Sequence, residues 1–359
     1  MSDWPLESPI TILVAVAFAC AATMAGASIA MRSRIFLDNP NHRSSHDHAT
    51  SRAGGLAILS GFAIGLLVIG VYTGAGGGVV WPFLLLTLLA GGVGLVDDRA
   101  DLPAVVKFAG QFFVALGFVW LIGPLETAPA PFIGEVETGA FGVFLTVFWL
   151  VAFMNVFNFM DGVNGIAAGA ALVGLFFFAL AAGLAGAGAA SVIALIGAVA
   201  AAGFLPANLL RGKLFMGDCG SHALAFIIAG VGVLAANETG ARASAAMMPM
   251  VFLPFILDVG FTLLHRTIRR QNILTAHREH VYQLILRRGA SHGTVAAIYA
   301  GLVAFGAAGA IFMMTLHPQT HLIVVGAYAI ALLAAAWRIY ARAVDDGLIL
   351  AGAPEERPS

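Results

Sequence analysis

Residues 141–159 read FGVFLTVFWLVAFMNVFNF, a run without a single charged side chain. A helix rises about 1.5 Å per residue, so a run of about 20 residues can cross the hydrocarbon core of a bilayer. The apolar side chains occupy consecutive positions instead of alternating ones, which indicates a helix and not a barrel strand. This stretch therefore predicts a transmembrane helix.

The whole chain has the same character. Of its 359 residues 60% are hydrophobic and 10% charged, whereas a soluble domain averages about 25% charged residues. We expect an all-α polytopic membrane helix bundle, with one domain over residues 1–345 and a short tail over 346–359. The expected spans are eleven, at 10–31, 54–71, 79–96, 104–122, 141–159, 163–182, 189–205, 223–236, 245–264, 294–316 and 322–340.

The charges indicate how the chain is oriented. If the N-terminus lies outside the cytoplasm, 17 of the 18 Lys and Arg residues fall in cytoplasmic segments, and Arg242 is the exception. This predicts an external N-terminus, a cytoplasmic C-terminus and a location in the bacterial inner membrane. The net charge of −1 excludes a nucleic-acid-binding protein, and two cysteines exclude a disulfide framework or zinc cluster.

Five polar stretches lie where expected spans meet the cytoplasm. Because they share one membrane depth, we expect their side chains to form one site. Their candidate residues are Arg43, His46 and Arg52; Asp97 and Asp98; Asn155, Asn158 and Asp161; Asn208 and Asp218; and His277, Arg278 and His280.

Carboxylates are the main chemical feature of these stretches. The adjacent Asp97 and Asp98 repel each other unless a cation is near, and Asp161 and Asp218 lie at other span ends. Such a set predicts a Mg²⁺ site, with Mn²⁺ as the alternative metal, because Mg²⁺ binds one or two carboxylates together with substrate phosphates. The alternative interpretation is a row of solvated helix ends.

Two further patterns have alternatives of the same kind. Asn155, Asn158 and Asp161 are three residues apart, so they share a helix face; they either line a polar pocket or bond neighbouring helices. The Gly217–Ser221 stretch either binds phosphate through backbone N–H groups or is an ordinary turn with Ser221 as the N-cap of the next helix.

The histidine loop completes the pattern. His277 and His280, with Arg278 between them, suit a diphosphate better than zinc, because no third clustered ligand accompanies them. The neighbouring Arg287 and Arg288 are expected to contact lipid headgroups.

In this order the motifs resemble those of the polyprenyl-phosphate N-acetylhexosamine-1-phosphate transferases. They are Asp97-Asp98, Asn155-x-x-Asn158-x-x-Asp161-Gly162, Phe215-Met216-Gly217-Asp218-x-Gly220-Ser221 and His277-x-x-His280. Members are multi-helix membrane enzymes that move a sugar 1-phosphate from a UDP-sugar to undecaprenyl phosphate and release UMP, with Mg²⁺ or Mn²⁺. The resemblance therefore implies as partners undecaprenyl phosphate, a UDP-N-acetyl sugar, membrane lipids and, as an assembly to be tested, a second copy of the chain.

The resemblance also implies residue roles. Asp218, with Asp161, would bind the metal. Asp97 or Asp98 would act as base or as nucleophile, and both readings stay open. The catalytic set implied is Asp97, Asp98, Asp161, His277 and His280, and the substrate-binding set is Arg43, His46, Arg52, Asn155, Asn158, Asn208 and Arg278.

Departures from the family pattern bear on the substrate. The first-loop motif has Ser51 and Ala53 where Pro and Gly are usual, and Asn164 stands where Asp is frequent. The stretch HREHVYQ at 277–283 resembles the O-antigen-initiating branch, including enzymes of 6-deoxy N-acetylamino sugars, and not the peptidoglycan pentapeptide branch. A UDP-GlcNAc-specific transferase is the alternative.

A cation-coupled secondary transporter is the rival from another class. Asp258, late in the ninth expected span after Pro254, would suit cation binding within the membrane. Against it, the candidate residues lie at one face instead of mid-bilayer, and the chain has no internal repeat. An inactive scaffold is a third reading, which the intact set of four carboxylates opposes.

The predicted orientation can be tested with reporter fusions. A reporter that is active only outside the cytoplasm should be silent when fused after Arg288 and active when fused at Glu135. Five of the eleven expected spans lie between these two sites, so they are on opposite sides of the membrane. The opposite pattern would overturn the orientation.

Overall fold

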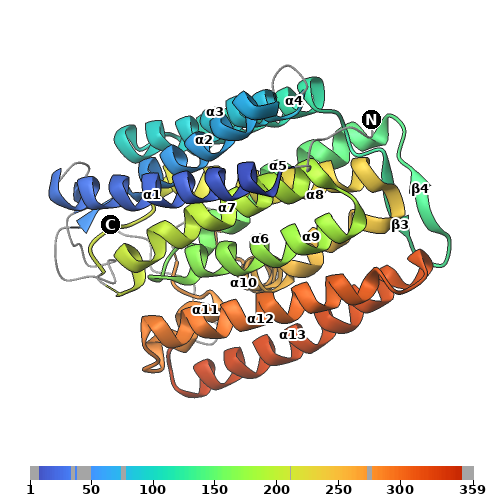
Figure 1. The fold of residues 1–359 in the computed structure, drawn as a ribbon. Helices are drawn as coiled ribbons and strands as arrows, with labels where there is room; N and C mark the ends of the chain where they lie inside the picture. Colours follow the sequence, from blue (N-terminus) through green and yellow to red (C-terminus); the bar gives the residue numbers. More distant parts are fainter. Residues whose placement is uncertain are drawn as a thin grey trace.

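The computed structural model describes residues 8–33, 37–38, 50–73, 78–210, 212–272 and 277–349. Most of these residues are helical and very few are in strands, so the expectation of an all-α membrane bundle is confirmed (Figure 1). The long helices are α1 Pro9–Ser33, α2 Gly54–Thr73, α3 Val80–Ala100, α4 Ala104–Leu121, α5 Phe141–Met160, α6 Ile166–Ala185, α7 Gly188–Leu205, α8 Gly217–Thr239, α12 His292–Met313 and α13 His321–Asp345. Ten helices of the described chain are long and apolar enough to cross a membrane.

The ninth expected span is not one helix. It consists of α9 Met247–Val251 and α10 Leu253–Ile268, which meet at Phe252. Pro254 has no backbone N–H to donate to the carbonyl of Met250, so a continuous helix would leave that carbonyl unpaired. Together α9 and α10 fill the place of the expected span, which accounts for ten long helices where eleven spans were predicted.

Short elements join the helices. They are β1 Leu37–Asp38, β2 Thr50–Ser51, β3 Thr127–Ala130, β4 Gly134–Glu137, the π-helix η2 Pro206–Leu210, the 3₁₀-helices η3 Gly240–Ala243 and η4 Pro318–Thr320, and α11 Val281–Arg287. Strands β1 and β2 are antiparallel, and so are β3 and β4, with Thr127 opposite Glu137. The β3–β4 hairpin and α11 lie at opposite ends of the bundle (Figure 1).

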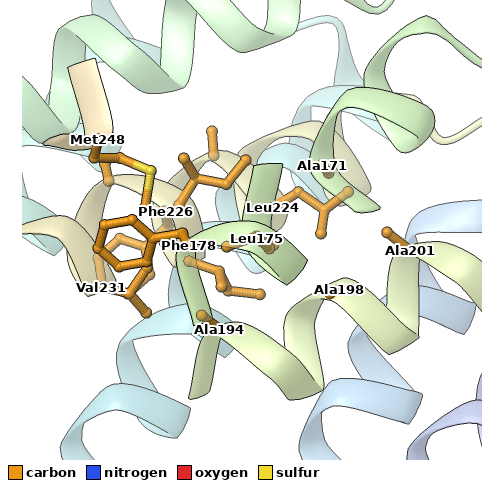
Figure 2. Packing of buried hydrophobic residues seen from close by; sticks show 14 of the residues in the cluster. Ala171, Leu175, Phe178, Ala194, Ala198, Ala201, Leu224, Phe226, Val231 and Met248 are labelled. Carbon is orange, nitrogen blue, oxygen red and sulfur yellow. The ribbon is translucent and has the colours of Figure 1, made fainter. Parts of the chain in front are cut away.

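Helix α8 is the centre of the bundle. Its residues from Cys219 to Ala236 are all buried, whereas α13 is largely exposed at the edge. Figure 2 shows Leu224 of α8 near Leu175 of α6 and a row of alanines on α7, of which Ala198 is one. Small side chains let helices approach closely in a membrane, where packing is the main attraction between them. The first turn of α8, which contains Asp218, is half-buried at the end of this central helix.

Candidate active site

Asp218 is the meeting point of three helices. Its Oδ1 accepts a hydrogen bond of 2.9 Å from Nδ2 of Asn158 on α5, and its Oδ2 lies 2.9 Å from Nζ of Lys107 on α4. Asn158 also donates to the hydroxyl of Ser221 at 2.9 Å. An amide and a cation therefore fix the direction of this carboxylate.

Asp98 of α3 binds the first turn of α8, which contains Asp218. Its Oδ1 and Oδ2 accept hydrogen bonds of 2.9 Å each from the backbone N–H groups of Asp218 and Cys219. The first N–H groups of a helix have no partner within it, and a carboxylate there also interacts favourably with the helix dipole. Asp98 is thus the cap of α8. The expectation that Ser221 caps this helix is wrong, because α8 begins four residues earlier, at Gly217.

Asp97 has different partners from those of its neighbour. It is buried, forms an ion pair with Lys107 and accepts a hydrogen bond of 2.9 Å from the backbone N–H of Leu102. Lys107 therefore links Asp97 and Asp218. The sequence reasoning counted Lys107 only as a positive charge, although a lysine one turn into an apolar span requires an anionic partner and was a signal for this contact.

Asn155 does not join Asn158 on Asp218. It donates to Oε1 of Gln111 at 2.7 Å and to the carbonyl of Val151 at 2.8 Å. Nε2 of Gln111 lies 2.7 Å from Nε2 of His222, and Nδ1 of His222 lies 2.7 Å from the carbonyl of Asp218. The structure thus shows Asn155 hydrogen-bonded to one neighbouring helix, α4, and to its own helix. Gln111 and His222, both buried, were missed by the sequence reasoning; Gln111 is a polar residue within an apolar run, whereas His222 directly follows the polar Gly217–Ser221 stretch.

Asp161 follows the last residue of α5 and faces the other carboxylates. The described residues donate no hydrogen bond to its side chain. Burial and the negative charges of Asp218 and Asp98 raise its pKa well above the usual range. A carboxylate in such surroundings is stabilised by a cation.

The carboxylate ligands around the start of α8 fit a divalent cation that also binds phosphate. Asp161 and Asp218 offer carboxylate oxygens, the ligands that Mg²⁺ prefers, and Mg²⁺ commonly takes its remaining ligands from substrate phosphates and water. No cluster of three His, Cys, Asp or Glu side chains suited to a metal occurs among the described residues. The protein alone thus provides a partial ligand set.

Asn208 connects two loops beside this cluster. Its Oδ1 accepts a hydrogen bond of 2.6 Å from the N–H of Gly165, and its Nδ2 donates to the carbonyl of Leu214 at 2.9 Å. Ser51 pairs with Leu214, and its carbonyl accepts from the N–H of Phe215 at 2.8 Å. Both polar atoms of the Asn208 amide thus contact backbone, which favours a structural role over the substrate-binding role expected from the sequence.

The first loop is described in part. Arg52 is exposed and follows Ser51, and its carbonyl lies close to Gly217, at the start of α8. Arg43 and His46 lie outside the described residues. The expected first-loop site is therefore represented in the structure by Arg52.

The histidine segment lies against the end of α5. The rings of His277 and His280 are stacked with centroids 4.9 Å apart, and the ring of His280 lies 6.1 Å from that of Phe159. The hydroxyl of Tyr282 donates to the carbonyl of Phe159 at 3.1 Å, two residues before Asp161. The structure thus brings His277, His280 and the Asn155–Asp161 stretch together.

Two side chains near this segment have clear environments. Arg278 is exposed. Burial and the nearby carboxylates of Asp258 and Asp161 raise the pKa of Tyr282, so its hydroxyl remains a donor.

Arg287 and Arg288, for which headgroup contacts were predicted, have protein partners. Arg287 donates to the carbonyls of Arg278 at 3.3 Å and Leu348 at 2.8 Å. Arg288 forms an ion pair of 2.8 Å with Asp346. These contacts attach α11 to the segment that follows α13.

Comparison with known proteins places these motifs in context. The profile described as Glycosyl transferase family 4 matches residues 80–236, which include Asp97, Asp98, Asp161 and Asp218. The chain is 32% identical over 260 residues to a "Probable undecaprenyl-phosphate N-acetylglucosaminyl 1-phosphate transferase" of Bacillus subtilis, with 71% of each chain covered.

Two other relatives extend the comparison. Over 327 residues the chain is 31% identical to a "Decaprenyl-phosphate N-acetylglucosaminephosphotransferase" of Mycobacterium tuberculosis, covering 81% of this chain and 79% of the relative. It is 30% identical over 204 residues to a "Phospho-N-acetylmuramoyl-pentapeptide-transferase" of Staphylococcus aureus, covering 53% and 63%. The similarity thus extends over more of the chain for the first two relatives.

Close backbone packing around Asp218 gives a test of this geometry. A Cβ at Gly94 of α3 would lie 2.1 Å from the carbonyl oxygen of Asp218, whereas a Cβ at Gly92 would meet nothing within 4 Å. Overpacking costs about 1–3 kcal/mol. We expect Gly94→Ala to lower the melting temperature of the purified protein in detergent by several degrees and Gly92→Ala to leave it unchanged. Equal melting temperatures for the two variants would contradict this packing.

Proposed function

Since the chain belongs to the polyprenyl-phosphate N-acetylhexosamine-1-phosphate transferase family, we propose that it transfers an N-acetylhexosamine 1-phosphate from a UDP-sugar to undecaprenyl phosphate and releases UMP. The observation that carries the proposal is the cluster at the start of α8. There Asp218 is held by Lys107 and Asn158 while Asp161 faces it without a hydrogen-bond donor from the described residues.

The reaction joins two anions, and this determines what the site has to provide. An oxygen of the lipid phosphate forms a bond to the phosphorus that is linked to the sugar. The bond from that phosphorus to the bridging oxygen breaks, and UMP leaves with the electron pair. Positioning the two phosphates and offsetting their charge are therefore the main catalytic tasks.

We assign the metal to Asp218 and Asp161. When bound, Mg²⁺ would offset the negative charge of the diphosphate and of the leaving UMP. Lys107 adds a fixed positive charge between Asp97 and Asp218. Asn158 donates a hydrogen bond to Oδ1 of Asp218 and so fixes the orientation of this carboxylate.

The two adjacent carboxylates have unequal surroundings. Both oxygens of Asp98 accept N–H groups of α8, so its role in this proposal is to hold the metal-binding turn. Asp97 is paired with Lys107 and is our choice for the group that receives a proton from the lipid phosphate. Attack by this carboxylate on phosphorus stays the alternative, with an aspartyl phosphate in place of direct transfer.

The histidine segment would bind the donor substrate. His277 and the exposed Arg278 offer N–H donors for the diphosphate and the sugar, beside Asp161, and the ring of His280 is stacked on that of His277. We place this end of the bundle on the cytoplasmic face of a bacterial plasma membrane, as the distribution of Lys and Arg predicts. The product would begin a cell-envelope polysaccharide.

The identity of the transferred sugar is the most specific part of the proposal. The names of the relatives from Bacillus subtilis and Mycobacterium tuberculosis favour N-acetylglucosamine. The HREHVYQ stretch favours a 6-deoxy N-acetylamino sugar such as N-acetylfucosamine, and O-antigen initiation as the pathway. A 6-deoxy sugar lacks the 6-hydroxyl of N-acetylglucosamine, so a site built to hydrogen-bond that hydroxyl would discriminate between the two donors.

A panel of donors tests the activity and the sugar together. Purified protein is incubated with undecaprenyl phosphate, Mg²⁺ and UDP-GlcNAc, UDP-GalNAc or a UDP-linked 6-deoxy N-acetylamino sugar, and UMP release is measured. We expect release with at least one donor, dependent on both the lipid phosphate and Mg²⁺. Release without lipid phosphate, or none with any donor while a Bacillus subtilis relative is active in the same assay, would refute the proposal.

Asp218 gives the sharpest test within the site. Asp218→Asn keeps the shape of the side chain but removes the charge that would bind the metal, so we expect kcat/KM to fall by about 100-fold or more at ordinary Mg²⁺ concentration. Cys219→Ala changes the adjacent buried residue without changing charge and should stay within about threefold of wild type. Near-normal UMP release by Asp218→Asn would contradict the metal assignment.

A further inference from the structure

Asp258 is a buried carboxylate that the proposed reaction leaves without a role. It lies in α10 after the break at Phe252 and is 3% exposed. A carboxylate buried in a membrane protein is costly unless hydrogen bonds stabilise its charge. Its partners therefore indicate what it does.

Four donors surround this carboxylate. Oδ1 accepts a hydrogen bond of 3.0 Å from the N–H of Val281, and Oδ2 accepts one of 3.0 Å from the N–H of Tyr282. The hydroxyl of Tyr299 on α12 also donates to Oδ2. Asp258 thus caps α11 at the point where the histidine segment ends.

The fourth donor is His280. Its Nδ1 lies 3.2 Å from Oδ1 of Asp258. Both carboxylate oxygens already accept N–H groups, so the carboxylate acts as an acceptor and Nδ1 carries the hydrogen. This contact fixes both the tautomer and the orientation of the ring.

The orientation of His280 affects its neighbour. The ring of His277 stacks on that of His280 at 4.9 Å and is the more exposed of the two. The ring of Phe159, whose centroid lies 6.1 Å from that of His280, packs beside the His280 ring. A rotation of the His280 ring would therefore displace the stacked pair.

We propose that Asp258 is a positioning residue, which anchors the start of α11 and orients His280, and through it His277, for binding the substrate diphosphate. The inference rests on the proposed function of the histidine segment. It also differs from cation transport, because every described side-chain contact of Asp258 is with an N–H or O–H donor, whereas a transported cation needs oxygen ligands.

A double-mutant cycle separates this role from a general effect on folding. Asp258→Asn and His280→Ala should each lower kcat/KM for the UDP-sugar by about 10–100-fold, since each disturbs a hydrogen bond to a charged group. If Asp258 acts through His280, kcat/KM of the double variant should be no lower than that of the less active single variant. Losses that multiply in the double variant would overturn the proposal.

Two further variants keep the test decisive. Thr262→Val removes a hydrogen bond of 2.8 Å to the backbone carbonyl of Asp258 and leaves the carboxylate intact, so activity should stay within about twofold. If Asp258→Asn does not fold, Tyr299→Phe removes one donor to the carboxylate and should lower kcat/KM by about 3–10-fold, an effect that should vanish in the His280→Ala background. Persistence of that loss in this background would overturn the proposal.

A measurement without substrate distinguishes this inference from the proposed function. Hydrogen–deuterium exchange of residues 277–287 should be faster in Asp258→Asn than in wild type and unchanged in Thr262→Val, because only the first replaces one of the two oxygens that accept the N–H groups of Val281 and Tyr282. Unchanged exchange in Asp258→Asn would refute the anchoring role, even if the wild-type protein showed no UMP release with any donor.

Discussion

The N-terminus of α8 is the constraint on which the candidate site depends. The first N–H groups of this helix have no partner within it, and the helix is buried from Cys219 onward, where an unsatisfied N–H costs about 1–3 kcal/mol. The carboxylate of Asp98 accepts two of them. This requirement fixes α3 against α8 and brings Asp97, Lys107 and Asn158 to the first turn, where Asp218 lies.

The same solution occurs a second time, at α11. Asp258 accepts the N–H groups of Val281 and Tyr282, as Asp98 accepts those of Asp218 and Cys219. In both cases a carboxylate from one membrane helix holds the start of another helix that is distant in sequence. The residues with proposed chemical roles, Asp218 and His280, lie at these two junctions.

The sequence predicted the kind of fold and the stretches that form the site, because apolar runs and charged residues are local signals. It did not predict partners. Nothing in the Asp97-Asp98 pair indicates that one carboxylate would bind Lys107 and the other would cap α8, since both contacts depend on how α3, α4 and α8 pack. Asn155 and Asn158 share a helix face, yet one bonds Gln111 and the other Asp218. The break at Phe252 could have been inferred from Pro254, whereas the buried pair of Gln111 and His222 required the structure.

The attachment of α11 to the end of the chain has a consequence for biosynthesis. Arg287 and Arg288 contact Leu348 and Asp346, which follow α13 and are translated some sixty residues after them. A ribosome that has synthesised α12 has therefore made the histidine segment but not Asp346 and Leu348, which contact Arg288 and Arg287. These two contacts form only once the residues after the last membrane helix have left the ribosome, so a nascent or prematurely terminated chain lacks part of the support for the histidine segment.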